Sequence, residues 1–283
     1  MWFRLCDGWF VIRGVEFAPM TTAFRTFVFL CLFAATASAQ STGAIVAVGG
    51  GGTTDAIVAR TLELAGGKNA IVAVLPQSSA VENAGDSSVK MWLDAGAKEA
   101  RKVDFAAPGA KAALEASTLI WMPGGDQNRL MKAIDGTGLD EVIRARYRAG
   151  AVVGGTSAGA AVLSKLMITG EADLKVLTAG KTELAKGLGI WEAGIFDQHF
   201  LQRQRNNRLL SAVLDNPGII GVGIDEATAA IVRNGQIEVV GRSAVVVFDS
   251  RKAKVEKTEA GGVVAGTGVI TSVLRQGMTL SLK

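Results

Sequence analysis

Ala151-Val-Val-Gly-Gly-Thr-Ser-Ala-Gly-Ala160 is the stretch that decides how this chain folds. Its apolar start, residues 151–153, leads into Gly155-Thr-Ser-Ala-Gly159, which fits the pattern G-x-S-x-G. This pattern is typical of a nucleophile elbow, where a serine stands at a sharp turn between a strand and a helix. The small residues 158–166 predict the helix, and the amide of Ala158 would then point at a developing oxyanion. A plain turn is the alternative, because 35 of the 283 residues are glycine.

Similar apolar runs recur upstream of this stretch, at residues 44–48, 70–75 and 118–122. Stretches of helical composition lie between the runs, for example at residues 54–64, 89–100 and 139–149. Unalternating apolar runs indicate strands buried on both faces, and their alternation with helices indicates βαβ units. We therefore predict an α/β fold with a mostly parallel open sheet flanked by helices. Ligands of such sheets bind beyond the carboxyl ends of the strands.

The pattern changes after residue 218 to short strands around Asn234-Gly235. Asn-Gly between apolar runs, here residues 229–233 and 237–240, is a strong hairpin signal. This predicts a C-terminal β-hairpin extension of the sheet. Since no repeat or linker interrupts the pattern, residues 40–283 are expected to form a single α/β catalytic domain.

The composition excludes several classes of protein. With 49% hydrophobic and 20% charged residues, the chain is too apolar to be disordered. A net charge of +4 and 6% aromatic residues argue against a dedicated nucleic-acid binder.

Residues 1–39 read as a leader. Arg25, the apolar residues 27–35 and Ala37-Ser-Ala39 resemble a signal peptide spanning residues 20–39, which predicts Met20 as the true start. An uncleaved membrane anchor is the alternative, but the apolar run is shorter than the roughly 20 residues that span a bilayer. We expect a secreted or periplasmic protein that begins at Gln40 and has no membrane contact after cleavage. Both cysteines, Cys6 and Cys31, lie in the leader.

No cofactor or metal is expected. The glycines at 49–52 follow a strand but do not fit G-x-G-x-x-G, and Gly180-Lys-Thr182 lacks the earlier glycine of a P-loop. His199 is the only histidine, and no cysteine lies beyond the leader, which nearly excludes a zinc site with nitrogen or sulfur ligands.

A serine nucleophile needs a base, and His199 is the only histidine available. It follows the apolar residues 193–196, so we expect it at a strand end on the same edge of the sheet. Three arginines follow, Arg203, Arg205 and Arg208. They could form a solvated face or a nucleic-acid patch, but beside a catalytic histidine they favour a clamp for carboxylates, with a helix beginning near Gln202.

Four motifs together resemble the cyanophycinase family, serine peptidases grouped with aspartyl dipeptidase on a fold similar to class I glutamine amidotransferases. The motifs are Gly124-Gly-Asp-Gln127, Gly155-Thr-Ser-Ala-Gly-Ala160, Asp197-Gln-His-Phe200 with its three arginines, and Gly223-Ile-Asp-Glu226. The resemblance extends from Gly43 to about Asp249. It implies Ser157 as nucleophile, His199 as base and Glu226 as the third triad member. It also implies an oxyanion hole near Gly125 and Asp126, and pocket residues Gln127, Asp197, Gln198, Arg203, Arg205 and Arg208.

Two assignments stay open at this stage. Asp197 is the rival of Glu226 for the acid, since it would share a face with His199 if the strand continued. The implied substrate is cyanophycin, a poly-aspartate chain bearing arginine on each side chain, which would be cut to β-Asp-Arg dipeptides through an acyl-enzyme. An Asp- or isoaspartyl-dipeptide is the alternative substrate, and a non-catalytic binding module is a remoter reading. A glutamine amidotransferase is disfavoured because the elbow carries serine, not cysteine. Whether the protein forms a homodimer is left open.

Overall fold

The computed structural model describes residues 11–12, 15–16, 42–170, 172, 174–256 and 258–283. The chain divides into two units, Met1–Gln40 and Ser41–Lys283. In the first unit, β1 (Val11–Ile12) pairs antiparallel with β2 (Val15–Glu16). The predicted signal peptide and its cleavage site lie outside the described residues.

The second unit is built on a central sheet of eight strands, in the order β18-β13-β12-β3-β7-β6-β4-β5. Five neighbours in this sheet are parallel: β3 (Ile45–Val48), β7 (Val152–Thr156), β6 (Leu119–Met122), β4 (Ile71–Val74) and β5 (Glu99–Lys102). The inner strands of this set are buried on both faces. The predicted α/β fold with a mostly parallel sheet is therefore confirmed.

An antiparallel extension continues the sheet beyond β3. It consists of β12 (Thr228–Arg233), β13 (Gln236–Gly241) and β18 (Thr279–Ser281). Asn234 and Gly235 join β12 to β13 with φ values of 52° and 74°. Both angles are positive, as a two-residue hairpin turn of this kind requires, which explains the Asn-Gly pair and confirms the predicted hairpin.

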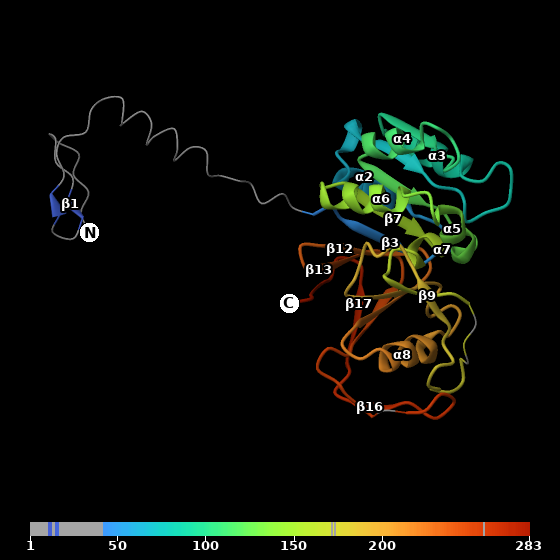
Figure 1. The fold of residues 1–283 in the computed structure, drawn as a ribbon, viewed down its shortest axis with the longest axis vertical. Helices are drawn as coiled ribbons and strands as arrows, with labels where there is room; N and C mark the ends of the chain where they lie inside the picture. The colour runs from blue at the N-terminus through green and yellow to red at the C-terminus, as the bar shows by residue number, and fades with distance from the viewer. Residues whose placement is uncertain (1–10, 13–14, 17–41, 171, 173, 257) are drawn as a thin grey trace. The chain divides into compact units, whose positions relative to one another are not determined.

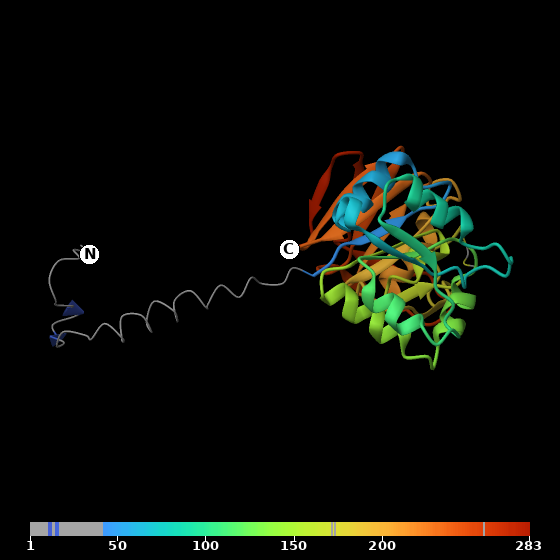
Figure 2. The ribbon, with the colours of Figure 1, turned by 90° about the horizontal axis from the view of Figure 1, so that it is seen from above.

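Helices cover both faces of the central sheet, as Figure 2 shows from above. One face carries α2 (Asp55–Leu64), α3 (Asp86–Asp94) and the short 3-10 turn η1 (Gly67–Asn69). The other carries α4 (Ala110–Ala116), α5 (Gln127–Ile134), α6 (Leu139–Arg148) and α7 (Ala158–Ala161). Two separate apolar cores form between the sheet and these helices, one on each face.

A second sheet, which the sequence did not reveal, lies below the first in Figure 1. Its order is β10 (Gly194–Asp197), β11 (Ile220–Ile224), β14 (Ala244–Asp249) and β17 (Ile270–Arg275). Helix α8 (Asn206–Asp215) packs on β11. Two small antiparallel pairs complete the unit: β8 (Leu166–Ile168) with β9 (Leu184–Lys186), and β15 (Lys254–Glu256) with β16 (Ala265–Thr267).

Two predicted helices are shorter than expected. The stretch 89–100 contains the end of α3 and the beginning of β5, whose sequence Glu-Ala-Arg-Lys is charged because it is an edge strand. The stretch 158–166 contains only one helical turn, α7, before β8 begins at Leu166. Strand β5 is half-buried to exposed and β8 is mostly buried but only three residues long, and in both places the composition also suits a helix.

Candidate active site

Ser157 stands at the turn between β7 and α7. Its φ of 54° and ψ of −115° are strained for a residue with a side chain. The flanking glycines make the turn possible by their size. A Cβ on Gly155 would lie 2.5 Å from the backbone of Gly159, and one on Gly159 would lie 1.9 Å from the carbonyl oxygen of Met122. The pattern G-x-S-x-G therefore reflects close packing of the elbow against β6.

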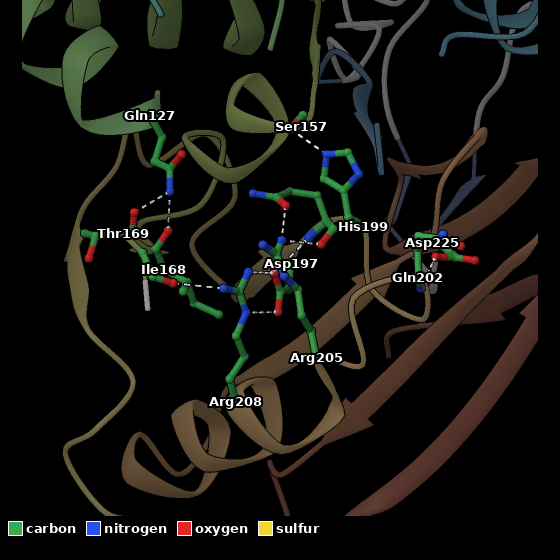
Figure 3. A network of polar contacts seen from close by, with 12 residues as sticks. Gln127, Ser157, Ile168, Thr169, Asp197, His199, Gln202, Arg205, Arg208 and Asp225 are labelled. Atoms are coloured by element: carbon green, nitrogen blue, oxygen red, sulfur yellow. Dashed lines mark hydrogen bonds and ion pairs between the residues drawn. The ribbon is translucent and has the colours of Figure 1, made fainter. Parts of the chain in front are cut away.

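The base candidate approaches Ser157 from the second sheet. Strand β10 ends at Asp197, and His199 turns away from it with a φ of 47°. The hydroxyl of Ser157 lies 2.9 Å from Nε2 of His199 (Figure 3). The His199 amide donates to the carbonyl of Gly49 over 2.7 Å, which fixes the histidine on the loop after β3.

Glu226 completes this line of side chains. Its Oε1 lies 2.6 Å from Nδ1 of His199. A carboxylate there accepts a hydrogen bond from Nδ1–H, and this tautomer leaves the lone pair of Nε2 facing the Ser157 hydroxyl.

The glycines at 49–52 acquire a structural role in the same place. A Cβ on Gly50 would lie 2.3 Å from Cε1 of His199, and one on Gly51 would lie 2.5 Å from Cβ of Glu226. In the loop after β3, the backbone of Gly50 and Gly51 therefore packs directly against the side chains of His199 and Glu226. Close approach of backbone to other groups is a common reason for such glycines.

Asp197, the rival acid, faces elsewhere. Its carboxylate accepts from the guanidinium of Arg208 and from the amide of Gln198. Because β10 ends at Asp197, the assumption that the strand continues through His199 is wrong. In the described part of the chain, the only carboxylate bonded to His199 is that of Glu226.

The turn after β6 lies against Ser157. A Cβ on Gly124 would be 3.4 Å from Cβ of Ser157. The amide of Asp126, one of the expected oxyanion donors, donates to the carbonyl of Ser78 over 2.8 Å. Among the described residues, the amides of Gly125 and Ala158 have no acceptor. Of the three expected donors, these two are available to a developing oxyanion.

Figure 3 shows Asp197, Arg205 and Arg208 on the side of the site near His199, and Gln127 farther away beside Ile168 and Thr169. Gln198 bonds to Arg205 and Asp197. We call Gln127, Asp197, Gln198, Arg205 and Arg208 the polar cluster. At its centre, Arg208 grips Asp197 with two bonds, from Nε over 2.8 Å and from Nη2. Nη1 of Arg208 donates to the carbonyl of Gly170 over 2.9 Å. Asp197 is 1% exposed and Arg208 5% exposed, so this ion pair is buried.

Gln127 faces the same segment of chain as Arg208. Its amide nitrogen donates to the carbonyls of Ile168 over 3.0 Å and Thr169 over 2.6 Å. Gln127 and Arg208 therefore both hold residues 168–170, the end of β8, against the site. Their hydrogen-bonding groups are largely used within the protein.

Arg205 differs from Arg208 in its environment. Its Nη1 donates to the backbone carbonyl of Gln198 over 2.6 Å and to the side-chain oxygen of the same residue. Burial, with a contribution from neighbouring Arg208, lowers the pKa of Arg205 to about 10, against the opposing effect of Asp197. Nε and Nη2 of Arg205 donate to no residue in the described part of the chain.

The expected start of the following helix is wrong. Helix α8 begins at Asn206, residues 200–205 form turns, and Arg205 occupies the N-cap position. Arg203 is exposed. Arg205 therefore precedes the helix that carries Arg208, and both side chains approach Asp197.

One important residue escaped the sequence reasoning. Asp225 accepts from the amides of Leu201 and Gln202 over 3.1 and 3.0 Å and from the hydroxyl of Ser243 over 2.7 Å. Burial raises its pKa, but these donors outweigh burial and leave the pKa below 3.8. The carboxylate thereby holds the turn that follows His199. Its place beside Glu226 in Gly223-Ile-Asp-Glu226 was the available signal.

Two general features of the described residues bear on the site. No group of three or more His, Cys, Asp or Glu side chains in this part of the chain could hold a metal ion. No helix among the described residues has the length and apolar character needed to cross a membrane.

Comparison with known proteins gives consistent results. The sequence profile described as Peptidase family S51 matches residues 45–240. The chain is 38% identical over 204 residues to a cyanophycinase of Geminocystis herdmanii, covering 69% of this chain and 75% of that one. It is 35% identical over 226 residues to a cyanophycinase of Synechococcus elongatus, covering 74% and 69%.

Solved structures show a similar fold. A peptidase from an acI-B1 actinobacterium superposes with a TM-score of 0.60 at 21% identity, covering 86% of this chain and 98% of that one. A putative peptidase E from Listeria monocytogenes gives a TM-score of 0.54 at 16% identity, covering 72% and 100%.

Proposed function

This chain belongs to peptidase family S51 and is a cyanophycinase-like serine peptidase, and from that premise we propose that Ser157, His199 and Glu226 are its catalytic triad. The observation that carries the proposal is the unbroken line of contacts, 2.9 Å from Ser157 to His199 and 2.6 Å from His199 to Glu226. The three residues come from different strand ends, so this alignment is a product of the fold and not of local sequence.

The geometry supports the following mechanism. Ser157 Oγ attacks the scissile carbonyl while Nε2 of His199 takes its proton. The Glu226 carboxylate holds the Nδ1 proton and stabilises the imidazolium that forms. The amides of Gly125 and Ala158 receive the oxyanion. His199 then protonates the leaving amine, and water repeats the sequence on the acyl-enzyme to release the acid and restore Ser157.

We propose that the substrate is cyanophycin, cut to β-Asp-Arg dipeptides. Each unit of this polymer carries a free carboxylate and a guanidinium. Arg205 is suited to bind a substrate carboxylate, because two of its nitrogen atoms donate to no residue in the described part of the chain and because burial disfavours its charge until a counter-ion binds. The names of the curated relatives support this substrate class. Arg203, exposed beside it, would add a second positive charge.

The test is incubation of the purified protein with insoluble cyanophycin, followed by mass analysis of the soluble products. We expect β-Asp-Arg, and we expect none from Ser157→Ala. A related peptidase acting on Asp- or isoaspartyl-dipeptides is the second candidate. Hydrolysis of such dipeptides to amino acids, with no cleavage of the polymer, would establish that alternative.

We also propose that the protein is exported, to the periplasm or the medium, with residues 20–39 as the signal peptide. The proposal rests on Arg25, the apolar run after it and Ala37-Ser-Ala39. N-terminal sequencing of the exported protein should give Gln40 as its first residue. A mature chain that retains residues 1–19 would refute both the start at Met20 and the cleavage site.

A further inference from the structure

A cavity of about 400 Å³ lies beside Ser157. It sits at the carboxyl ends of three parallel strands: Thr156 ends β7, Gly124 follows β6, and Ser79 follows β4. A Cβ on Gly124 would be 3.9 Å from Oγ of Ser157, so one wall of the cavity borders the nucleophile. Helix α3 contributes Met91 to the same cavity.

The cavity and the polar cluster lie on opposite faces of the central sheet. Met91 and Trp121, which line the cavity, pack in the core beneath α2 and α3. Gln127 of the polar cluster belongs to α5, whose buried side chains pack in the other core, as does Phe196 next to Asp197. Ser157 stands between the two regions, at the carboxyl end of β7, which is an inner strand of the central sheet.

The two regions differ in chemistry. The cavity has no ionisable side chain in its lining and offers hydroxyl groups, those of Thr53, Ser79, Ser87, Ser88 and Thr156. Hydroxyls donate and accept hydrogen bonds, so they can bind both the N–H and the C=O of a substrate amide. The lining offers no counter-ion, so an ionised group gains no ion pair by entering the cavity. The polar cluster, in contrast, carries two arginines against one aspartate.

We propose that the cavity is the subsite for the substrate unit across the scissile bond from the unit that meets Arg205, and that it binds this unit through uncharged amide and methylene groups. The protein would then recognise the charged groups of the substrate unit on one side of the scissile bond only. The inference rests on the proposed function and names how the two sides of the cut are recognised. The charged ends of the unit in the cavity point to solvent.

Synthetic dimers of two β-Asp-Arg units test the asymmetry. The free carboxylate of one arginine is converted to a carboxamide, in one unit at a time, with the rest unchanged. We expect kcat/KM to fall roughly 10- to 150-fold for the unit that meets Arg205, the range for a lost charge-assisted hydrogen bond, and to change less than about threefold for the other. Equal losses in both units, or no loss in either, would overturn the inference.

Substitutions that fill the cavity test whether it binds a substrate unit. Ala84 and Ser87 line it, and Ala84→Trp and Ser87→Trp would each place an indole inside. We expect both to raise KM for the unmodified dimer by about tenfold or more, in protein whose thermal midpoint shows it folded. The matched control is Ala112→Trp on the exposed face of α4, which should keep the parental KM.

The outcomes separate the two proposals. Parental KM values in both folded cavity variants would refute the subsite while leaving cyanophycin as substrate. If the parent protein cleaves none of the dimers, the proposed substrate itself fails, and this subsite assignment fails with it.

Discussion

Replacing Arg208 by alanine should destabilise the fold before it affects substrate recognition. The substitution removes both guanidinium bonds to Asp197 and the bond to the carbonyl of Gly170. Asp197, 1% exposed, would keep only the amide of Gln198 and Arg205 at 3.7 Å. Leaving one partner of a buried ion pair alone costs about 3–5 kcal/mol. In a domain of this size that is a fall of roughly 6–20 °C in the thermal midpoint.

The assay is thermal and urea unfolding of Arg208→Ala, of one control variant and of one double variant. Arg203→Ala, at an exposed position, is the matched control and should stay within about 0.5 kcal/mol of the parent. Asp197→Asn combined with Arg208→Met removes both charges of this pair and should recover part of the loss, because Asp197 is then no longer a buried carboxylate without Arg208. An Arg208→Ala protein with the parental unfolding midpoint and a selective loss of polymer cleavage would refute this reasoning and make Arg208 a substrate ligand.

Further outcomes are expected at other positions. Ser157→Ala and His199→Ala should each lower kcat by several orders of magnitude, and the double variant should lose little more, because the two act as a unit; kinetic comparison of the three folded proteins decides. Glu226→Gln should lower kcat with little change in KM, since the amide cannot stabilise the imidazolium; an effect on KM alone would contradict its role. Arg205→Ala should lower kcat/KM on cyanophycin roughly 10- to 150-fold and spare a neutral ester, and Arg205→Lys should restore only part; equal loss on both substrates would show a structural role. Asp225→Asn should be less stable than the parent, with the difference full above pH about 4 and vanishing as pH falls, because the folded-state pKa of Asp225 lies below its ordinary 3.8; a difference independent of pH in urea unfolding would contradict this.

The central sheet and the elbow could be predicted because their causes are local. Strands buried on both faces are continuous apolar runs in the sequence. The close contact of residue 159 with Met122 leaves no room for a Cβ, so the sequence has a glycine there. The hairpin at Asn234-Gly235 has a similarly local signal, the positive φ of both residues.

The second sheet and the internal pairing of the polar cluster could not be predicted in this way. Strands β10, β11 and β14 are buried like those of the central sheet, so their composition does not show that they form a separate sheet. Strand β17 is largely exposed and carries no apolar run. The partner of Arg208 is eleven residues away around a turn, and only the three-dimensional course of that turn shows Asp197 to be its counter-ion. The same holds for Asp225, whose donors are 18, 23 and 24 residues distant. The helix expected near Gln202 begins at Asn206, because residues 200–205 form the turn that brings Arg205 towards Asp197.

The order of the site residues along the chain bears on synthesis in the cell. Ser157 follows a strand of the central sheet, His199 follows β10 of the second sheet, and Glu226 lies between β11 and β12, which belong to different sheets. A nascent chain that has emerged only through β7 therefore presents a serine without a base. The base and the acid arrive later and are aligned only when both sheets are in place. The alignment of these three residues therefore depends on the packing of both sheets and comes late in the folding of the chain.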